Sequence, residues 1–199
     1  MSIIKAKVDY IINGPNDEYY TPIEAVEMIL PFIPESVKTI WECTAIKESR
    51  IVEVLRVNGY DVIPSHIDDG KDFLTYKPVE DYDIIITNPP YSLKYEFLKR
   101  AFSLKKPFMF LLPTTTLEGK KRGKLFRENN IQLLVPDGRF SFTQKKNGAW
   151  FHTSWFTYGL GLEKDLNFIA LNDRYNPPSQ RSNPDTSVID LYNDLRKAA

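Results

Sequence analysis

Four consecutive residues, Asn88-Pro89-Pro90-Tyr91, hold the groups of this chain that are best suited to chemistry. The two prolines have a fixed φ and no N–H to donate, so they end the preceding isoleucine-rich run and hold their carbonyl oxygens out as acceptors. The Asn88 side-chain oxygen is a further acceptor, and Tyr91 adds a flat aromatic face. Two convergent acceptors beside a ring suit an exocyclic amino group on a planar base.

An amino group of this kind, such as that of adenine, is a poor nucleophile because its lone pair is delocalised into the ring. If the Asn88 side chain and the Pro89 carbonyl each accept one N–H, the nitrogen moves toward a tetrahedral shape and its lone pair points at an electrophile. These residues would act by orientation and electrostatics, without a covalent nucleophile. Because a base must leave the duplex stack to arrive there, we expect Tyr91 to stack against a flipped base.

Apolar runs and amphipathic segments alternate along the chain and predict the elements that position this turn. Apolar runs predict strands at 38–43, 60–67, 81–87, 107–113, 131–136 and 149–160. Periodic apolar or charged segments predict helices at 21–30, 48–59, 95–104 and 118–129. The alternation predicts an α/β class with a mostly parallel sheet and helices on both faces. Ligands of such sheets bind outside the carboxyl ends of the strands, and Asn88 lies at such an end.

The first predicted helix has a start signal in Thr21-Pro22-Ile23-Glu24. Pro22 suits the first helical position, Thr21 can cap the free N–H groups, and Glu24 can complete a capping box. We expect Pro31 and Pro34 to end this helix.

The turn from Asn88 to Tyr91 resembles the catalytic motif of the amino-group DNA methyltransferases. The resemblance is greatest to the small phage-type adenine-N6 enzymes, which use S-adenosylmethionine and carry no separate recognition domain. It extends from Asp17 to about Leu162, through DEYYTP, GKDF, PFMFLLP and NGAWFHTSWF in the order of that family. It implies one Rossmann-like methyltransferase domain at 17–171, after an N-terminal extension at 1–16. A polar tail at 172–199 follows, with a short helix expected near its end.

The resemblance also implies a cofactor site built from several segments. Tyr20 and Thr21 belong to DEYYTP, which helps to hold the cofactor in that family, and Glu42 matches an acidic residue that meets the ammonium of the cofactor. Thr44 lies in the loop that follows, and His66 falls near the position that binds the ribose hydroxyls. The alternatives are a hydrophobic staple for the tyrosines and a satisfied strand-end histidine for His66.

Asp72 and Phe73, in the segment GKDF, are implied to contact the adenine of the cofactor. Asp72 would accept from its amino group, and Phe73 would stack on its ring. The alternative is an ordinary turn followed by a core phenylalanine.

The loop after the first strand, 41–49, departs from the family pattern because it contains no glycine. Glycines in such a loop let the backbone approach a bound cofactor. One interpretation is an active enzyme with a rebuilt loop. Another is a non-catalytic, methyltransferase-like protein that binds nucleic acid or another protein, as a phage counter-defence factor would. The intact turn at Asn88 favours the enzyme. Methylation of RNA, or of a protein glutamine amide with the same planar geometry, is a third interpretation.

A basic run, formed by Lys120, Lys121, Arg122 and Lys124, follows the strand predicted at 107–113. It lies on the same sheet edge as Asn88 and suits a phosphate backbone, which favours DNA as the partner, although charge runs are usually solvated helix faces. Phe151 aligns with an aromatic residue that faces the target base in the family.

Composition limits the remaining possibilities. The chain of 199 residues is 42% hydrophobic, which predicts a packed globule, and its 26 basic and 26 acidic residues leave any nucleic-acid contact to local patches. The single cysteine excludes an intramolecular disulfide and a cysteine-rich zinc site, and two distant histidines predict no metal site. No segment predicts a signal peptide or a bilayer span, so a cytoplasmic protein is expected.

Overall fold

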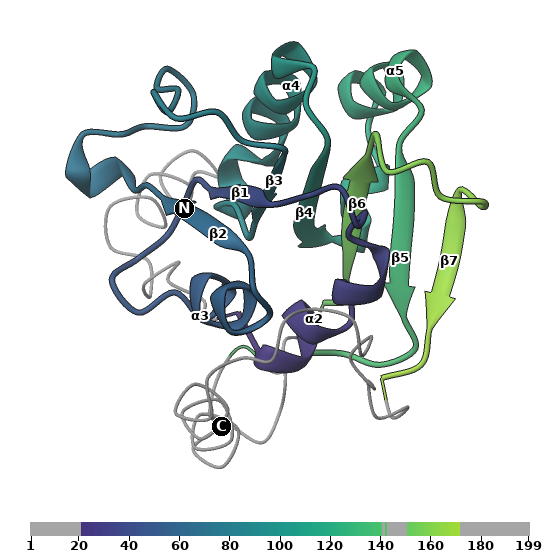
Figure 1. The fold of residues 1–199 in the computed structure, drawn as a ribbon. Coiled ribbons are helices and arrows are strands. Elements are labelled where there is room, and N and C mark those ends of the chain that lie inside the picture. Colours follow the sequence, from purple (N-terminus) through teal and green to yellow (C-terminus); the bar gives the residue numbers. More distant parts are fainter. Residues whose placement is uncertain (1–20, 141, 143–150, 172–199) are drawn as a thin grey trace, which may run out of the picture.

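A single sheet organises the chain in the computed structural model, which describes residues 21–140, 142 and 151–171. Its strands lie in the order β2-β1-β3-β4-β6-β5-β7 (Figure 1). They are β1 (Thr39–Glu42), β2 (Asp61–Pro64), β3 (Ile84–Thr87), β4 (Phe108–Pro113), β5 (Gln132–Pro136), β6 (Thr153–Tyr158) and β7 (Leu166–Ile169). Pairing is parallel except along β6, which runs antiparallel to both of its neighbours. The prediction of an α/β fold with a mostly parallel sheet is therefore confirmed.

Helices cover both faces of this sheet, as predicted (Figure 1). The described α-helices are α2 (Ile23–Glu27), α3 (Arg50–Val57), α4 (Lys94–Leu104) and α5 (Lys120–Asn129). Buried residues of α2 and α3 pack with Ile84 and Ile86 in one apolar cluster, while those of α4 and α5 pack with Ile85 in a second. The alternation of side chains along β3 thus supplies both cores, because successive residues of a strand point to opposite faces.

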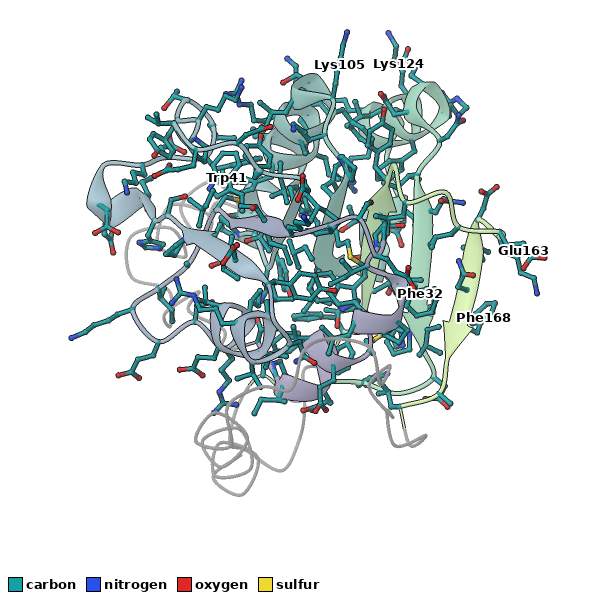
Figure 2. The ribbon with its side chains drawn as sticks, in the orientation of Figure 1. Phe32, Trp41, Lys105, Lys124, Glu163 and Phe168 are labelled. Atoms are coloured by element: carbon teal, nitrogen blue, oxygen red, sulfur yellow. The ribbon has the colours of Figure 1, made fainter. Side chains whose placement is uncertain are left out.

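The central strands β3 and β4 are buried along their whole length. This is the environment that continuous apolar runs predict for parallel strands covered by helices on both sides. In Figure 2, Lys105, Lys124 and Glu163 project from the periphery of the molecule, whereas Trp41 of β1 lies within it. The loops that follow β3 and β4 therefore begin at strands that are fixed by packing on both faces.

The predicted start of the first helix is wrong in its details. Pro22 occupies the N-cap of α2, and no side chain caps this helix, so neither Thr21 nor Glu24 forms the predicted capping box. The Thr21 hydroxyl instead accepts a hydrogen bond from the side chain of Asn88. The helix also ends at Glu27, because Pro31 has no N–H to donate to the carbonyl of Glu27 and its ring crowds that carbonyl.

Two features of the sheet have no counterpart in the sequence-based prediction. The strand β7, Leu166–Ile169, was not predicted, and it pairs with β5 at the edge of the sheet. The insertion of β6 between β4 and β5 was not predicted either. Within the described ranges, no helix has the length and apolarity that a bilayer crossing requires.

Some predictions fall outside the residues that the structure describes. They are the extension at 1–16, the tail at 172–199 with its helix, and Tyr20 as a cofactor residue.

Candidate active site

A cavity of about 530 Å³ lies where the carboxyl ends of β1, β2 and β3 meet. The turn Asn88–Tyr91 forms part of its wall. The described residues predicted to hold a cofactor also line it: Thr21, Glu42, Thr44, His66, Asp72 and Phe73. Residues from five separate stretches of sequence are thus brought to one site, because parallel strands deliver their following loops to the same edge of a sheet.

The turn after β3 is built by its two prolines. Pro90 precedes the 3-10 turn Tyr91–Leu93, and its carbonyl accepts from the N–H of Leu93 at 3.0 Å. The Lys94 ammonium donates to the carbonyl of Tyr91 at 2.8 Å, at the first residue of α4. The Pro90 carbonyl is therefore used inside the turn, which leaves Pro89 as the proline whose carbonyl can serve a ligand.

The side-chain amide of Asn88 is paired at one end only. Its Nδ2 donates to the Thr21 hydroxyl at 3.2 Å. Its Oδ1 is buried, and no described residue donates to it. Leaving a buried acceptor without a partner costs about 1–3 kcal/mol, so native structures seldom do so without a reason. Since Asn88 lines the cavity, a ligand with an N–H is the partner that would relieve this cost.

The carboxylate of Glu42, in contrast, is held by the protein itself. Its Oε1 accepts from the Thr87 hydroxyl at 2.6 Å and from both the N–H and the hydroxyl of Thr44, at 3.1 and 3.0 Å. The Ser49 hydroxyl donates to Oε2 at 3.4 Å. Burial raises the pKa of Glu42 to about 7, against these hydrogen bonds, which lower it. This carboxyl therefore gains or loses a proton near neutral pH.

The network around Glu42 includes two residues that the sequence analysis missed, Thr87 and Ser49. Thr87 is the last residue of β3, and Ser49 is the N-cap of α3, where its hydroxyl accepts from the N–H of Val52. The N-cap pattern at Ser49 could have been read from the sequence. No local signal relates Thr87 to a carboxylate 45 positions away.

Cys43, the single cysteine of the chain, also lines the cavity but is not suited to act as a nucleophile. It is buried, and burial together with the neighbouring Glu42 raises the pKa of its thiol well above the usual value. Because the thiolate is the reactive form, this thiol is expected to be inert.

Phe73 packs chiefly as a core residue, although it reaches the cavity wall. Only 1% of its surface is exposed, and its ring stacks on that of Phe97 with centroids 4.8 Å apart. The ring of Trp41 lies 5.2 Å away on a tilted plane. Asp72 accepts from the N–H of Leu74 at 2.9 Å, which closes a local turn. The geometry thus contains the turn and core phenylalanine of the alternative interpretation, placed beside the cavity.

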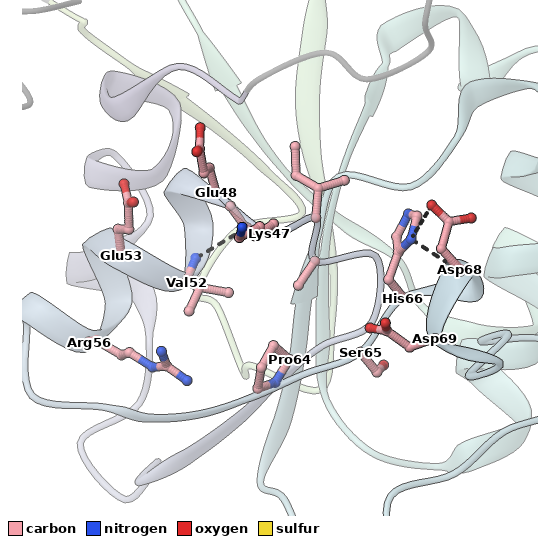
Figure 3. Close-up of a pocket in the computed structure, with 13 residues that line it drawn as sticks. Lys47, Glu48, Val52, Glu53, Arg56, Pro64, Ser65, His66, Asp68 and Asp69 are labelled. Carbon is pink, nitrogen blue, oxygen red and sulfur yellow. Dashed lines mark hydrogen bonds and ion pairs between the residues drawn. The ribbon is translucent and has the colours of Figure 1, made fainter.

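His66, at the end of β2, lies between this cavity and a larger one of about 820 Å³. Its Nδ1 accepts from the N–H of Asp68 at 3.3 Å and lies 3.3 Å from a carboxylate oxygen of the same residue. In Figure 3 the larger cavity has Lys47, Glu53 and Arg56 on one side and His66 on the other. It does not include the Asn88 turn, so its greater volume does not make it the site of the chemistry.

Phe151 lies beside the turn, where the resemblance places an aromatic residue. Its ring meets that of Tyr91 edge to face, with centroids 5.7 Å apart. The two rings therefore form one aromatic surface next to Asn88.

The predicted basic residues lie on α5, outside the cavity. Lys121 stands 5.9 Å from the ring centroid of Tyr95, which follows the Asn88 turn closely in α4. Arg122 donates to the carbonyl of Thr116 at 2.7 Å. Lys124 pairs with Glu128 at 3.7 Å on the same exposed helix face. Lys120 is exposed. Lys121 thus lies near the start of α4, whereas Arg122 and Lys124 interact with residues close to them in the sequence.

In the described part of the chain, no group of three or more His, Cys, Asp or Glu side chains is arranged to hold a metal ion.

Comparison with solved structures identifies the fold. A methyltransferase subunit of a type I restriction-modification system from Streptococcus thermophilus superposes with a TM-score of 0.53, at 13% identity over 91% of this chain and 53% of its own. A protein from Listeria monocytogenes, assigned as a class I S-adenosylmethionine-dependent methyltransferase, gives a TM-score of 0.50, at 12% identity over 96% of this chain and 75% of its own.

This chain spans about half the length of the streptococcal subunit. No protein-family model and no curated protein sequence matches it. At these identities the similarity concerns the fold alone. The chain therefore shares its α/β fold with these two methyltransferase structures, and the Asn88 turn and Glu42 lie at the carboxyl edge of its sheet.

Proposed function

We propose that this protein transfers a methyl group from S-adenosylmethionine to the N6 amino group of adenine in DNA. The observation that carries the proposal is the buried Oδ1 of Asn88 in the wall of a cavity, an acceptor to which no described residue donates. An amino group is the donor that this acceptor lacks. The edge of the sheet at which it lies is where α/β folds bind their ligands.

The residues around the cavity fit a cationic cofactor. Glu42 is a buried carboxylate at the end of β1, adjacent to the Asn88 turn through Thr44 and Thr87. Ionisation of Glu42 would supply a negative charge beside a bound ammonium or sulfonium, and burial strengthens this interaction. When bound, the sulfonium supplies an activated methyl group, so no metal is required.

The residues of the turn orient the acceptor nitrogen. Asn88 Oδ1 and the Pro89 carbonyl each accept one N–H of the amine, which fixes the direction of its lone pair. Tyr91 and Phe151 provide aromatic surface for a base that has left its stack. The contribution is positioning and electrostatic stabilisation, for which removal of one hydrogen-bonding group typically costs about 10²–10³ in rate.

Two observations favour DNA as the acceptor. The streptococcal structure belongs to a restriction-modification system, and the cationic side chain of Lys121 lies near the start of α4. Both favour a nucleic acid over a protein acceptor.

A second candidate function is that of a non-catalytic binder with a methyltransferase fold. One observation favours it: Glu42 already accepts from Thr44, Thr87 and Ser49, so its carboxylate does not depend on a cofactor for hydrogen bonds. The glycine-free loop at 41–49 agrees with this candidate. Calorimetric titration with S-adenosylmethionine separates the two, because the binder would show no heat of binding.

The direct test is incubation with methyl-labelled cofactor and a mixture of adenine-containing DNA, RNA and protein acceptors. We expect label in DNA with the wild-type protein and none with Asn88→Ala. Label in RNA or in protein would overturn the assigned acceptor while leaving methyl transfer intact. Absence of label in every acceptor, together with absence of cofactor binding, would replace the proposal with the binder.

A further inference from the structure

The usefulness of Asn88 depends on which end of its amide faces the cavity. A side-chain amide has an acceptor oxygen at one end and an NH₂ donor at the other, and the two ends have nearly the same shape. With Oδ1 in the cavity, the residue accepts from an amine. With Nδ2 there, it would present N–H groups to the N–H groups of the substrate, and positioning would fail.

A hydroxyl can accept or donate, and in the described part of the chain the Thr21 hydroxyl accepts from Asn88. The Asn88 Nδ2 donates to the Thr21 hydroxyl at 3.2 Å, while Oδ1 has no partner there. The main-chain carbonyl of Asn88 lies separately against the Thr44 hydroxyl at 3.3 Å, where the single hydroxyl proton is shared with the closer Glu42 carboxylate at 3.0 Å. The rotation of the amide about its side-chain bonds is therefore restrained by Thr21.

The backbone and the surroundings of Thr21 restrict the movement of its side chain. It precedes Pro22, and a residue before proline is confined to extended backbone conformations. The helix that follows, α2, is anchored by the buried side chains of Ile23 and Val26, and only 6% of Thr21 is exposed. Thr21 does not cap α2, so its oxygen remains available to accept from Asn88.

We propose that Thr21 is the positioning residue of the catalytic amide: its hydroxyl oxygen holds the Asn88 NH₂ group and so directs Oδ1 at the substrate amine. This inference rests on the proposed methyltransferase function. It assigns Thr21 a role toward Asn88, whereas the resemblance implied a role in holding the cofactor. The pair joins residues 67 positions apart, and therefore connects the start of α2 to the end of β3.

Two substitutions test this role. Thr21→Val keeps the shape of the side chain but removes the acceptor, and Thr21→Ser keeps the acceptor. Since a hydrogen bond of this kind is worth about 1 kcal/mol, we expect kcat to fall roughly fivefold to tenfold in the valine variant. The KM for the cofactor is expected to stay the same, and the serine variant is expected to restore kcat.

Two kinetic outcomes would overturn the assignment. A valine variant with wild-type kcat would show that the contact does not matter for orientation. A rise in the cofactor KM with unchanged kcat would assign Thr21 to the cofactor.

A second readout does not require turnover. In a nitrogen-15 NMR spectrum, the side-chain NH₂ of Asn88 is identified by its loss in Asn88→Asp. We expect one of its two protons to move upfield in Thr21→Val and to stay in place in Thr21→Ser. An unchanged pair in the valine variant would contradict the inference even if the wild-type protein transferred no methyl group. Such a missing activity would itself count against the proposed function alone.

Discussion

Two loops at the same edge of the sheet differ in whether the protein supplies hydrogen-bond donors to their polar side chains. At the end of β1, where one loop begins, the Glu42 carboxylate accepts four hydrogen bonds from Thr44, Thr87 and Ser49. In the loop after β3, the buried Oδ1 of Asn88 accepts none from a described residue. Both loops line one cavity.

This difference indicates that the Glu42 carboxylate stabilises the fold, whereas the Asn88 oxygen is available to a ligand. The partners of Glu42 stabilise the folded state with or without a ligand, and removal of this carboxyl would take an acceptor from the buried Thr87 hydroxyl and from the half-buried hydroxyls of Thr44 and Ser49. The Asn88 oxygen contributes nothing comparable to the fold, because no donor among the residues at 21–140, 142 and 151–171 offsets its desolvation. Substitutions in the two loops should therefore differ in whether stability or activity responds.

The largest expected effect is a contrast between Asn88→Ala and Glu42→Ala. The first should lower methyl transfer at least about 100-fold and change the free energy of unfolding by less than about 1 kcal/mol. The second should cost about 3 kcal/mol of stability, because it leaves a small cavity and unpaired hydroxyls. Labelled-methyl transfer and denaturant titrations measure the two quantities. Equal destabilisation by both substitutions would remove the distinction between the loops.

The pH dependence of stability tests the environment of Glu42. The pKa of this carboxyl is about 7 in the folded protein, whereas its ordinary value, which applies to the unfolded chain, is 4.5. Between these pH values the folded state therefore binds more protons than the unfolded state. The free energy of unfolding should therefore fall as pH rises from about 4.5 to about 7, by about 3 kcal/mol in total.

Glu42→Gln, which cannot ionise, isolates this contribution. The difference in unfolding free energy between wild type and the glutamine variant, from urea titrations at pH 5 and pH 8, should change by that amount. A difference independent of pH would mean that Glu42 is ionised throughout.

A smaller effect is expected from Thr87→Val, which preserves shape but removes the 2.6 Å hydrogen bond to Glu42. This bond lowers the pKa of Glu42, so its loss should move the pH dependence to higher pH. At pH 8 the variant should be about 1–2 kcal/mol less stable than wild type, because a bond to an ionised carboxylate is lost. At pH 5 the loss should be smaller. A cost that is identical at both pH values would speak against a titrating partner.

The smallest effect concerns the basic residues of α5. The double substitution Lys120→Glu and Lys121→Glu should weaken binding of a DNA duplex by roughly tenfold at low salt, and by less as salt is raised. The matched control, the double substitution Lys38→Glu and Lys164→Glu, makes the same change in net charge at exposed positions before β1 and β7, at the amino ends of these strands, and should have no effect. Fluorescence anisotropy with a labelled duplex measures both. An equal loss in the control would assign the effect to net charge alone.

The sequence predicts the Asn88 turn well because its signals are local. Two prolines after an apolar run end a strand wherever they occur, and the alternation of elements places that end on the ligand-binding edge. The helices α3 and α4 follow in the same way from the periodic spacing of their apolar residues, and α5 follows from its charged, amphipathic segment. β7 was missed because it is four residues long and half exposed, so its apolar residues give no clear pattern.

The side-chain contacts at the site could not be predicted, because they join distant positions. Thr21 carries a helix-capping signal, yet its hydroxyl is engaged by Asn88 from the end of β3. Glu42 and Thr87 are likewise brought together by the pairing of β1 with β3. The Thr21 hydroxyl does not cap the helix, because the tertiary structure brings the side-chain NH₂ group of Asn88 to the same oxygen.

The central claim is that Asn88 presents its oxygen to the amino group of an adenine. It is tested most directly by nucleoside mass spectrometry of DNA treated with cofactor-saturated protein. We predict N6-methyladenine from the wild-type protein and none from Asn88→Ala, with similar cofactor affinity for both. Equal N6-methyladenine from both proteins, or unmodified adenine from a wild-type protein that binds the cofactor, would contradict the account.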